Sequence, residues 1–149
     1  MHKRDFSGSN RLLLLSAFAV VIGGLSTLGA WLLLAMIRFF TNLFFYQAFS
    51  LAQSSPADNT LGAWVILVPA LGGLIVGLMA RYGSDKIRGH GIPEALEAIL
   101  FGKSQMSAKV AVLKPLSSGV VIGSGGPFGA EGPVIMTGGA AASLLAQAF

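Results

Sequence analysis

The chain has 149 residues, of which 54% are hydrophobic and 11% are charged, and its formal net charge is +4. Soluble domains carry about 25% charged residues, so this composition excludes an ordinary soluble protein and predicts an integral membrane protein. The sequence contains no cysteine and two histidines, which excludes disulfides and thiol chemistry and argues against a histidine-based metal site. We expect neither a metal ion nor another cofactor.

Two long uncharged stretches predict transmembrane helices, over about 12–40 and about 61–80. No charged residue lies between Leu12 and Ile37 or between Leu61 and Ala80, and a helix needs about 20 apolar residues to cross the hydrocarbon core. The first stretch is longer than the apolar core of a secretory signal peptide, which has roughly 7–15 residues. This length favours a retained span over a cleaved signal.

The positions of the charged residues predict the orientation of the chain. The basic residues that flank the two spans are Lys3, Arg4 and Arg11 before the first and Arg81, Lys86 and Arg88 after the second. The segment between the spans, residues 41–60, holds a single charged residue, Asp58. By the positive-inside rule, residues 1–11 and the loop after the second span are cytoplasmic. We expect a multi-pass protein of a bacterial-type inner or cell membrane. Because the basic residues flank spans and form no common face, nucleic acid is not an expected partner.

Beyond the second span the hydrophobic segments are short and interrupted. The stretch "GHGIPEALEAILF", residues 89–101, predicts a helix over about 92–101. At 1.5 Å per residue this helix is about 15 Å long, half of the hydrocarbon thickness, and Lys103, Lys109 and Lys114 follow it, so we expect a re-entrant helix. Two further helices, over about 108–122 and about 132–149, are separated by the glycines of "GSGG". The spacing of Gly73 and Gly77 fits close helix packing, although such glycines are also common in membrane helices.

Two of these helices begin with the same pattern, in "GHGIPE" and in "GAEGPV". In each, glycines precede a proline that suits the first turn of a helix. The free N–H groups of a first turn carry about half a positive charge, so two such ends buried in one site would hold an anion without a cationic side chain. Short hydrophobic segments with glycine and proline at their ends also indicate a transporter binding site.

Glu131 is the only charged residue between Pro115 and Phe149. An ionised acid inside a membrane costs about 2.5–3.5 kcal/mol on insertion scales, which makes it a functional candidate. Placed just before the helix that Pro133 opens, its carboxylate would compete with an anion for the same N–H groups, and protonation would release it. The alternative is that Glu131 caps the helix or lies in water at the membrane surface.

Both helix starts, about 40 residues apart and after two long hydrophobic stretches, resemble the N-terminal part of the first half of a CLC chloride channel or chloride/proton antiporter. In that family the motifs are usually written GSGIP and GREGP. The resemblance implies an all-α membrane fold of short, broken and re-entrant helices in two inverted halves, and a homodimer with an anion pathway in each protomer. Residues 12–149 would be a partial transmembrane domain of this type.

The resemblance also implies a function and a set of site residues. The function is voltage- or pH-gated transport of chloride or a similar anion, either by a channel or by exchange with protons, with Glu131 as the gating glutamate. The residues that correspond to the two anion-binding motifs are Gly89, His90, Gly91, Ile92 and Pro93 in the first and Gly129, Ala130, Gly132 and Pro133 in the second.

The chain departs from the family pattern in three ways. His90 replaces a serine that helps to coordinate the central anion, and it is either a loop residue or part of the pathway. Ala130 replaces the arginine of the second motif. Motifs of the second half, including a further helix start and a tyrosine, are absent from residues 1–149, so the resemblance implies a fragment or a truncated product.

Two alternative functions follow from the sequence. The chain could be a truncated membrane subunit without transport of its own, or a secondary transporter of another substrate. An enzyme is not expected, because the broken-helix region offers one acid and no nucleophile with a base near it in sequence.

Overall fold

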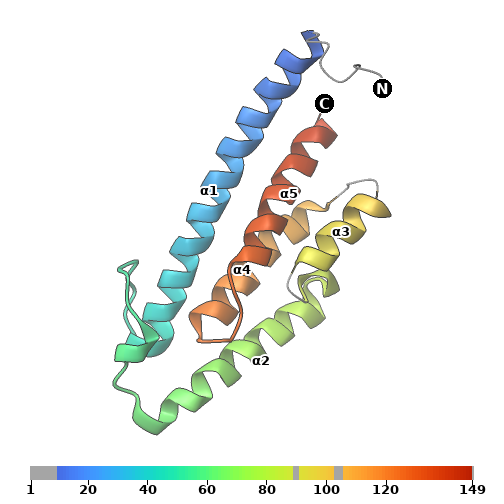
Figure 1. Ribbon diagram of the computed structural model, residues 1–149. Coiled ribbons are helices and arrows are strands. Elements are labelled where there is room, and N and C mark those ends of the chain that lie inside the picture. Colours follow the sequence, from blue (N-terminus) through green and yellow to red (C-terminus); the bar gives the residue numbers. More distant parts are fainter. Residues whose placement is uncertain (1–9, 89–90, 103–105, 149) are drawn as a thin grey trace, which may run out of the picture.

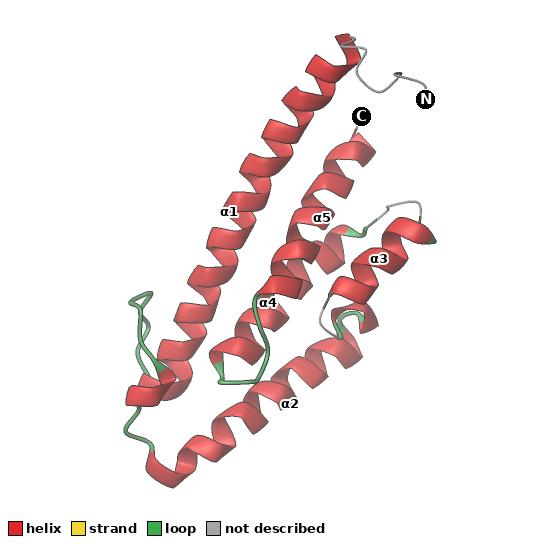
Figure 2. Cartoon of the chain, in the orientation of Figure 1, coloured by secondary structure: helices red, strands yellow, loops and turns green. Residues whose placement is uncertain are grey.

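The computed structural model describes residues 10–88, 91–102 and 106–148, and within these ranges the regular secondary structure is all helical, with no strand (Figure 2). This confirms the predicted all-α fold class. The helices are α1 (Asn10–Tyr46), α2 (Leu67–Tyr82), α3 (Ile92–Leu100), α4 (Ala108–Gly123) and α5 (Glu131–Ala148). Short 3₁₀ helices cover Pro56–Asp58, Gly62–Ile66 and Asp85–Ile87.

Two segments are long and apolar enough to cross a membrane, Leu12–Tyr46 and Gly62–Tyr82. α1 has 37 residues and is therefore about 55 Å long, more than the hydrocarbon core requires. The helix continues beyond the predicted end near residue 40, because residues 41–46 are helix-compatible and contain neither glycine nor proline. It ends before Gln47, whose φ of 53° is incompatible with a right-handed helix.

α4 and α5 fill the space between α1 and α2, which diverge from the segment 47–61 (Figure 1). α4 and α5 form an antiparallel pair, and α3 lies against α5 on the side away from α1. The connection after α4 turns back along that helix before α5 begins (Figure 1), so that Pro133 of α5 lines one cavity together with Ser117 and Ser118 of α4. The start of α5 is thereby placed beside the middle of α4 and not beyond its end.

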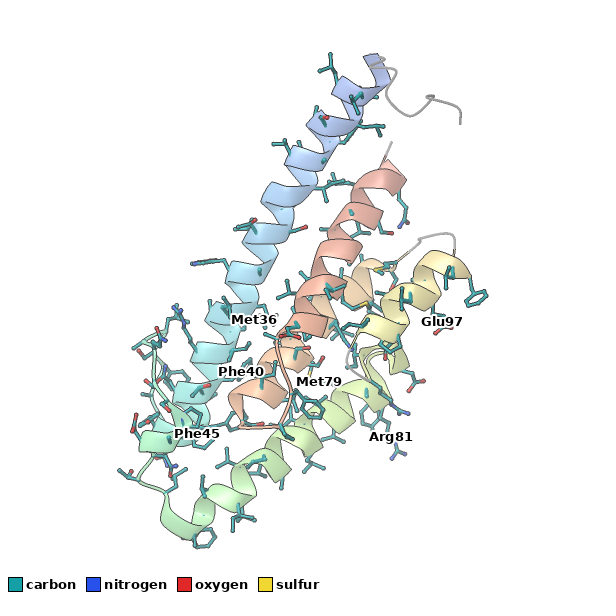
Figure 3. All side chains as sticks on the ribbon, in the orientation of Figure 1. Met36, Phe40, Phe45, Met79, Arg81 and Glu97 are labelled. Carbon is teal, nitrogen blue, oxygen red and sulfur yellow. The ribbon has the colours of Figure 1, made fainter. Side chains whose placement is uncertain are left out.

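α1 and α4 cross closely because α4 carries small residues at the contact. A Cβ atom added to Gly123 would lie 2.5 Å from the Cβ of Phe40 and 3.1 Å from the carbonyl oxygen of Ile37. Met36 and Phe40 lie one turn apart on α1, and both contact α4. Figure 3 shows them on the side of α1 that faces α4. This backbone approach fixes the position of α4, and through α4 that of the site described below.

Asn42 ties the segment after α1 to the end of that helix. Its side chain is 3% exposed, and its Nδ2 atom lies 3.0 Å from the carbonyl oxygen of Ser50 and 2.8 Å from that of Ala52. Its Oδ1 atom accepts a hydrogen bond of 2.7 Å from Ser54 Oγ. The hydrogen bonds of this one buried amide thus hold residues 50–54 in place, although these residues form no helix or strand.

The Asn42→Leu variant should loosen this segment. Leucine preserves the approximate volume but leaves two carbonyl oxygens and a hydroxyl without their partner, which costs about 1–3 kcal/mol. Thermal unfolding in detergent and the rate of proteolysis within residues 47–61 would measure the effect. Asn59→Leu is the matched control, because the hydrogen bonds of the Asn59 side chain are local: it donates to Pro56 O and accepts from the Leu61 N–H. Equal effects of the two substitutions would contradict the assigned role of Asn42.

Candidate anion site

The two helix starts predicted to bind an anion lie in contact. α3 is preceded by Gly91, whose φ of 94° is in the left-handed region. A Cβ atom at Gly91 would lie 3.0 Å from the carbonyl oxygen of Gly132 and 2.7 Å from Met136 Cγ, both in α5. Glycine therefore meets two requirements here, because it allows the positive φ and the close approach of the two backbones.

Both helices begin where the sequence favours a start. In α3, Pro93 lies in the first turn, and Glu94 Oε2 accepts a 2.9 Å hydrogen bond from the Gly91 N–H. That bond satisfies the donor that precedes the helix and leaves the first-turn N–H groups directed outward. In α5, Pro133 occupies the equivalent turn after Glu131 and Gly132. Each helix therefore presents the positive end of its dipole near the Gly91–Gly132 contact.

A small apolar cluster holds α3 against α4 and α5. Its buried members are Ala95, Met106, Val110, Met136 and Ala140. The backbone N–H of Met106 donates to Ser143 Oγ at 2.9 Å, and Gln147 Nε2 donates to Met106 O at 3.3 Å. The residues before α4 are thus attached to the C-terminal half of α5. These bonds help to hold the starts of α3 and α5 in position relative to each other.

A cavity of about 130 Å³ opens next to the start of α5 and to residues 87–88, which precede α3. Its walls come from α2, from the residues that lead into α3, from α4 and from the beginning of α5. The lining residues are Val76, Ile87, Arg88, Ser117, Ser118, Val121, Ile122, Phe128, Gly129 and Pro133. No acidic residue occurs in this lining, and its one charged member, Arg88, pairs with Asp85 at 3.0 Å.

A larger cavity, of about 230 Å³, lies along α3, from its first turn to the residues that follow it. It is lined by Glu94 and Glu97 and by apolar side chains that include Phe101 and Met106, and Figure 3 shows Glu97 on α3. Two carboxylates disfavour an anion there. The smaller cavity is therefore the one whose chemistry suits an anion.

A buried lysine lies beside the segment that leads into α3. Lys114 of α4 is 2% exposed, and its Nζ atom donates to the carbonyl oxygens of Ile87 at 3.0 Å and of Arg88 at 3.3 Å. An ammonium group is retained inside a protein only where it is hydrogen-bonded or paired. Lys114 fixes the approach to the first helix start and adds positive charge behind the wall of the smaller cavity.

Comparison with known proteins identifies the family of the chain. A family model described as voltage gated chloride channel matches residues 71–149. The chain belongs to the CLC family of voltage-gated chloride channels. It is 31% identical over 134 residues to the voltage-gated ClC-type chloride channel ClcB of Yersinia pseudotuberculosis, which covers 88% of this chain and 32% of that protein. It is 35% identical over 82 residues to a putative chloride channel protein, ClcB-like, of Ralstonia nicotianae, which covers 55% of this chain and 19% of that protein.

Another relative is the voltage-gated ClC-type chloride channel ClcB of Shigella flexneri, 37% identical over 97 residues, 62% of this chain and 23% of that protein. The chain thus spans between about a fifth and a third of the length of these curated CLC relatives. No solved structure matches the chain. Membership of the CLC family and the apolar helices place the protein in a membrane.

The predicted CLC motif residues near the Gly91–Gly132 contact differ in their exposure. Gly91, Gly132 and Pro133 are buried, Ala130 is half-buried, and Ile92, Pro93, Gly129 and Glu131 are exposed. Gly89 and His90 lie outside the described residues. The side chain of Glu131 forms no hydrogen bond or ion pair with the residues that the structure describes, so it does not cap α5 here.

Three residues of this region were missed from the sequence, namely Arg88, Lys114 and Ser118. A signal existed for Lys114, because it is a lysine in the interior of a largely apolar helix, directly before a proline. Serines in a membrane helix give no such signal, since they commonly bond to their own helix.

Proposed function

We propose that this chain takes part in the passage of chloride or a similar small anion across a membrane. The contact between Gly91 and Gly132 is the observation that carries the proposal, because it joins two helix starts whose free N–H groups favour negative charge. An anion bound mainly by backbone groups can be held strongly enough to replace hydration and weakly enough to leave. The names of the CLC relatives support chloride as the anion.

We further propose that Glu131 gates this passage. It is the first residue of α5, so its carboxylate can reach the N–H groups that an anion would use. Its exposure, and its lack of a hydrogen bond to any described residue, support a side chain that can move toward the helix start and away from it. Protonation would remove its negative charge and favour the anion, which would couple transport to pH or to proton movement.

The Glu131→Gln variant tests the gate. Glutamine keeps the size of the side chain and removes its charge, so the flux of the variant should lose its dependence on pH and any coupled proton uptake. We would reconstitute the chain in liposomes and record chloride efflux and proton uptake together. The expected change at neutral pH is about tenfold, the effect of one charged competitor worth about 1.4 kcal/mol.

Asp58→Asn is the matched control, since Asp58 is an exposed acid in the segment between the two long helices. It should leave both fluxes unchanged. Identical pH profiles for the wild type and Glu131→Gln would refute the gating role. Chloride efflux without proton movement would assign a channel, and coupled movement of both ions would assign an antiporter.

A second candidate function is that of a membrane subunit that associates with a larger CLC protein and has no transport of its own. Saturable chloride binding by the purified chain together with no flux would favour this function. A homodimer, several membrane crossings, an inner-membrane location and a cytoplasmic N-terminus are part of the proposal and follow from the charge distribution and the family.

A further inference from the structure

The cavity of about 130 Å³ contains a hydroxyl group whose partner is missing. Ser118 of α4 lines this cavity and is 6% exposed. Its two neighbours of the same type donate to carbonyl oxygens of their own helix, Ser117 to Lys114 and Ser124 to Val121, both at 3.0 Å. No hydrogen bond joins Ser118 Oγ to any residue in the described part of the chain.

The Ser118 hydroxyl must therefore face open space. Among the described residues, no fully buried side-chain oxygen or nitrogen lacks a hydrogen-bond partner. An oxygen without a partner is consequently not fully enclosed, and the cavity is the space that Ser118 lines. A hydroxyl in a nearly buried residue needs a partner, because leaving it unbonded costs about 1–3 kcal/mol.

Two basic residues lie at this cavity. Arg88 lines the cavity, and the Lys114 ammonium lies behind the wall, bonded to the carbonyl oxygens of Ile87 and Arg88. The acids of the region are already engaged: Asp85 pairs with Arg88 at 3.0 Å, and Glu94 accepts from the Gly91 N–H. The cavity thus combines a hydroxyl donor with cations and has no acid among the described residues that line it.

The geometry points to a second anion-binding site in this cavity, beside the start of α5, with Ser118 Oγ as a direct donor to chloride or a similar monovalent anion. Lys114 supplies the positive potential, and Arg88, which also pairs with Asp85, supplies a further N–H donor. Neither they nor Ser118 belong to the two glycine-proline motifs. Since one water occupies about 30 Å³ of the liquid, the cavity has room for a halide with accompanying water. The inference rests on the proposed function for the choice of ligand, because both concern an anion that passes this bundle.

Chloride binding to the purified chain, measured separately from flux, tests this site. We would titrate the chain in nanodiscs with sodium chloride against sodium gluconate at constant ionic strength and follow the binding by chloride NMR line width. Ser118→Ala should weaken the binding about tenfold, as expected for the loss of one hydrogen bond to a charged group. Ser118→Thr keeps the hydroxyl and should retain most of the affinity.

Ser124→Ala is the matched control, because Ser124 is a buried serine at the end of α4 whose hydroxyl is already bonded and lies outside the cavity. It should bind chloride like the wild type. Arg88→Gln should weaken binding more than Arg81→Gln, which removes an exposed arginine at the end of α2, shown in Figure 3.

Three results would overturn the site. They are unchanged binding by Ser118→Ala, equal losses in Ser118→Ala and Ser124→Ala, and no saturable binding by the wild type. The two proposals fail in different ways. If the chain transports chloride and Ser118→Ala binds chloride as the wild type does, the proposed function stands and this site is rejected. If binding depends on Ser118 but no chloride is transported, the site stands and transport is rejected.

Discussion

Replacing Gly72 by alanine is expected to destabilise the bundle by about 2–3 kcal/mol, because the added methyl group has no room where α2 crosses α4. A Cβ atom at Gly72 would collide with Ser124 Oγ and lie 2.5 Å from Ser124 Cβ. Ser124 is fully buried and cannot yield without displacing the end of α4. Thermal unfolding in detergent, followed by the fluorescence of the two tryptophans, would report the loss.

The neighbouring glycine provides an unusually close control. Gly73 is also in α2, but a Cβ atom there would meet nothing within 4 Å. Gly73→Ala should therefore stabilise the helix, by about 0.5–1 kcal/mol, since alanine loses less backbone entropy than glycine. The same substitution at two adjacent positions is thus expected to change the free energy of unfolding in opposite directions.

A second substitution would show whether the collision itself is responsible. Ser124→Gly removes both atoms that the new methyl group meets, so the double variant with Gly72→Ala should recover much of the lost stability relative to Ser124→Gly alone. Additive effects of Gly72→Ala and Ser124→Gly would contradict the crossing between α2 and α4.

The glycines of α2 show which features of the fold could be predicted from the sequence and which could not. Uncharged stretches and helix-start patterns predicted helices close to those observed, because these signals are local. The spacing of Gly73 and Gly77 suggested the packing face, yet neither approaches a neighbouring atom among the described residues, and Gly72 does. Which glycine faces α4 depends on the rotation of α2 within the bundle, and that rotation is set by contacts between segments far apart in the chain.

The same distinction applies to the candidate site. The repeated glycine-proline starts predicted an anion site, because free N–H groups at a helix start follow from local sequence. The sequence could not show that Gly91 contacts Gly132, nor that the ammonium group of Lys114 bonds to Ile87 and Arg88, since these contacts depend on the packing of α3 and α4. From the sequence alone a lysine is expected at the surface. Its burial becomes favourable only when the folded chain brings hydrogen-bond acceptors to its ammonium group.

Gly91→Ala is expected to reduce anion flux at least about tenfold, which corresponds to roughly 1.4 kcal/mol or more. The substitution combines two effects: alanine at a φ of 94° costs about 1–2 kcal/mol, and its methyl group would lie 2.7 Å from Met136 Cγ and 3.0 Å from Gly132 O. Relief of these contacts separates the two helix starts. Chloride efflux from liposomes would measure the loss, with circular dichroism to establish that the helices persist.

Gly62→Ala separates the two effects, because Gly62 has a positive φ of 58° but nothing within 4 Å of its added Cβ atom. Its variant carries only the backbone strain and should transport anions nearly as well as the wild type. If Gly91→Ala transported as well as Gly62→Ala, the contact with Gly132 would not matter for the anion, and the proposed function would lose the observation that carries it. A selective loss in Gly91→Ala would tie transport to the juxtaposition of the two helix starts, because strain alone is common to both variants.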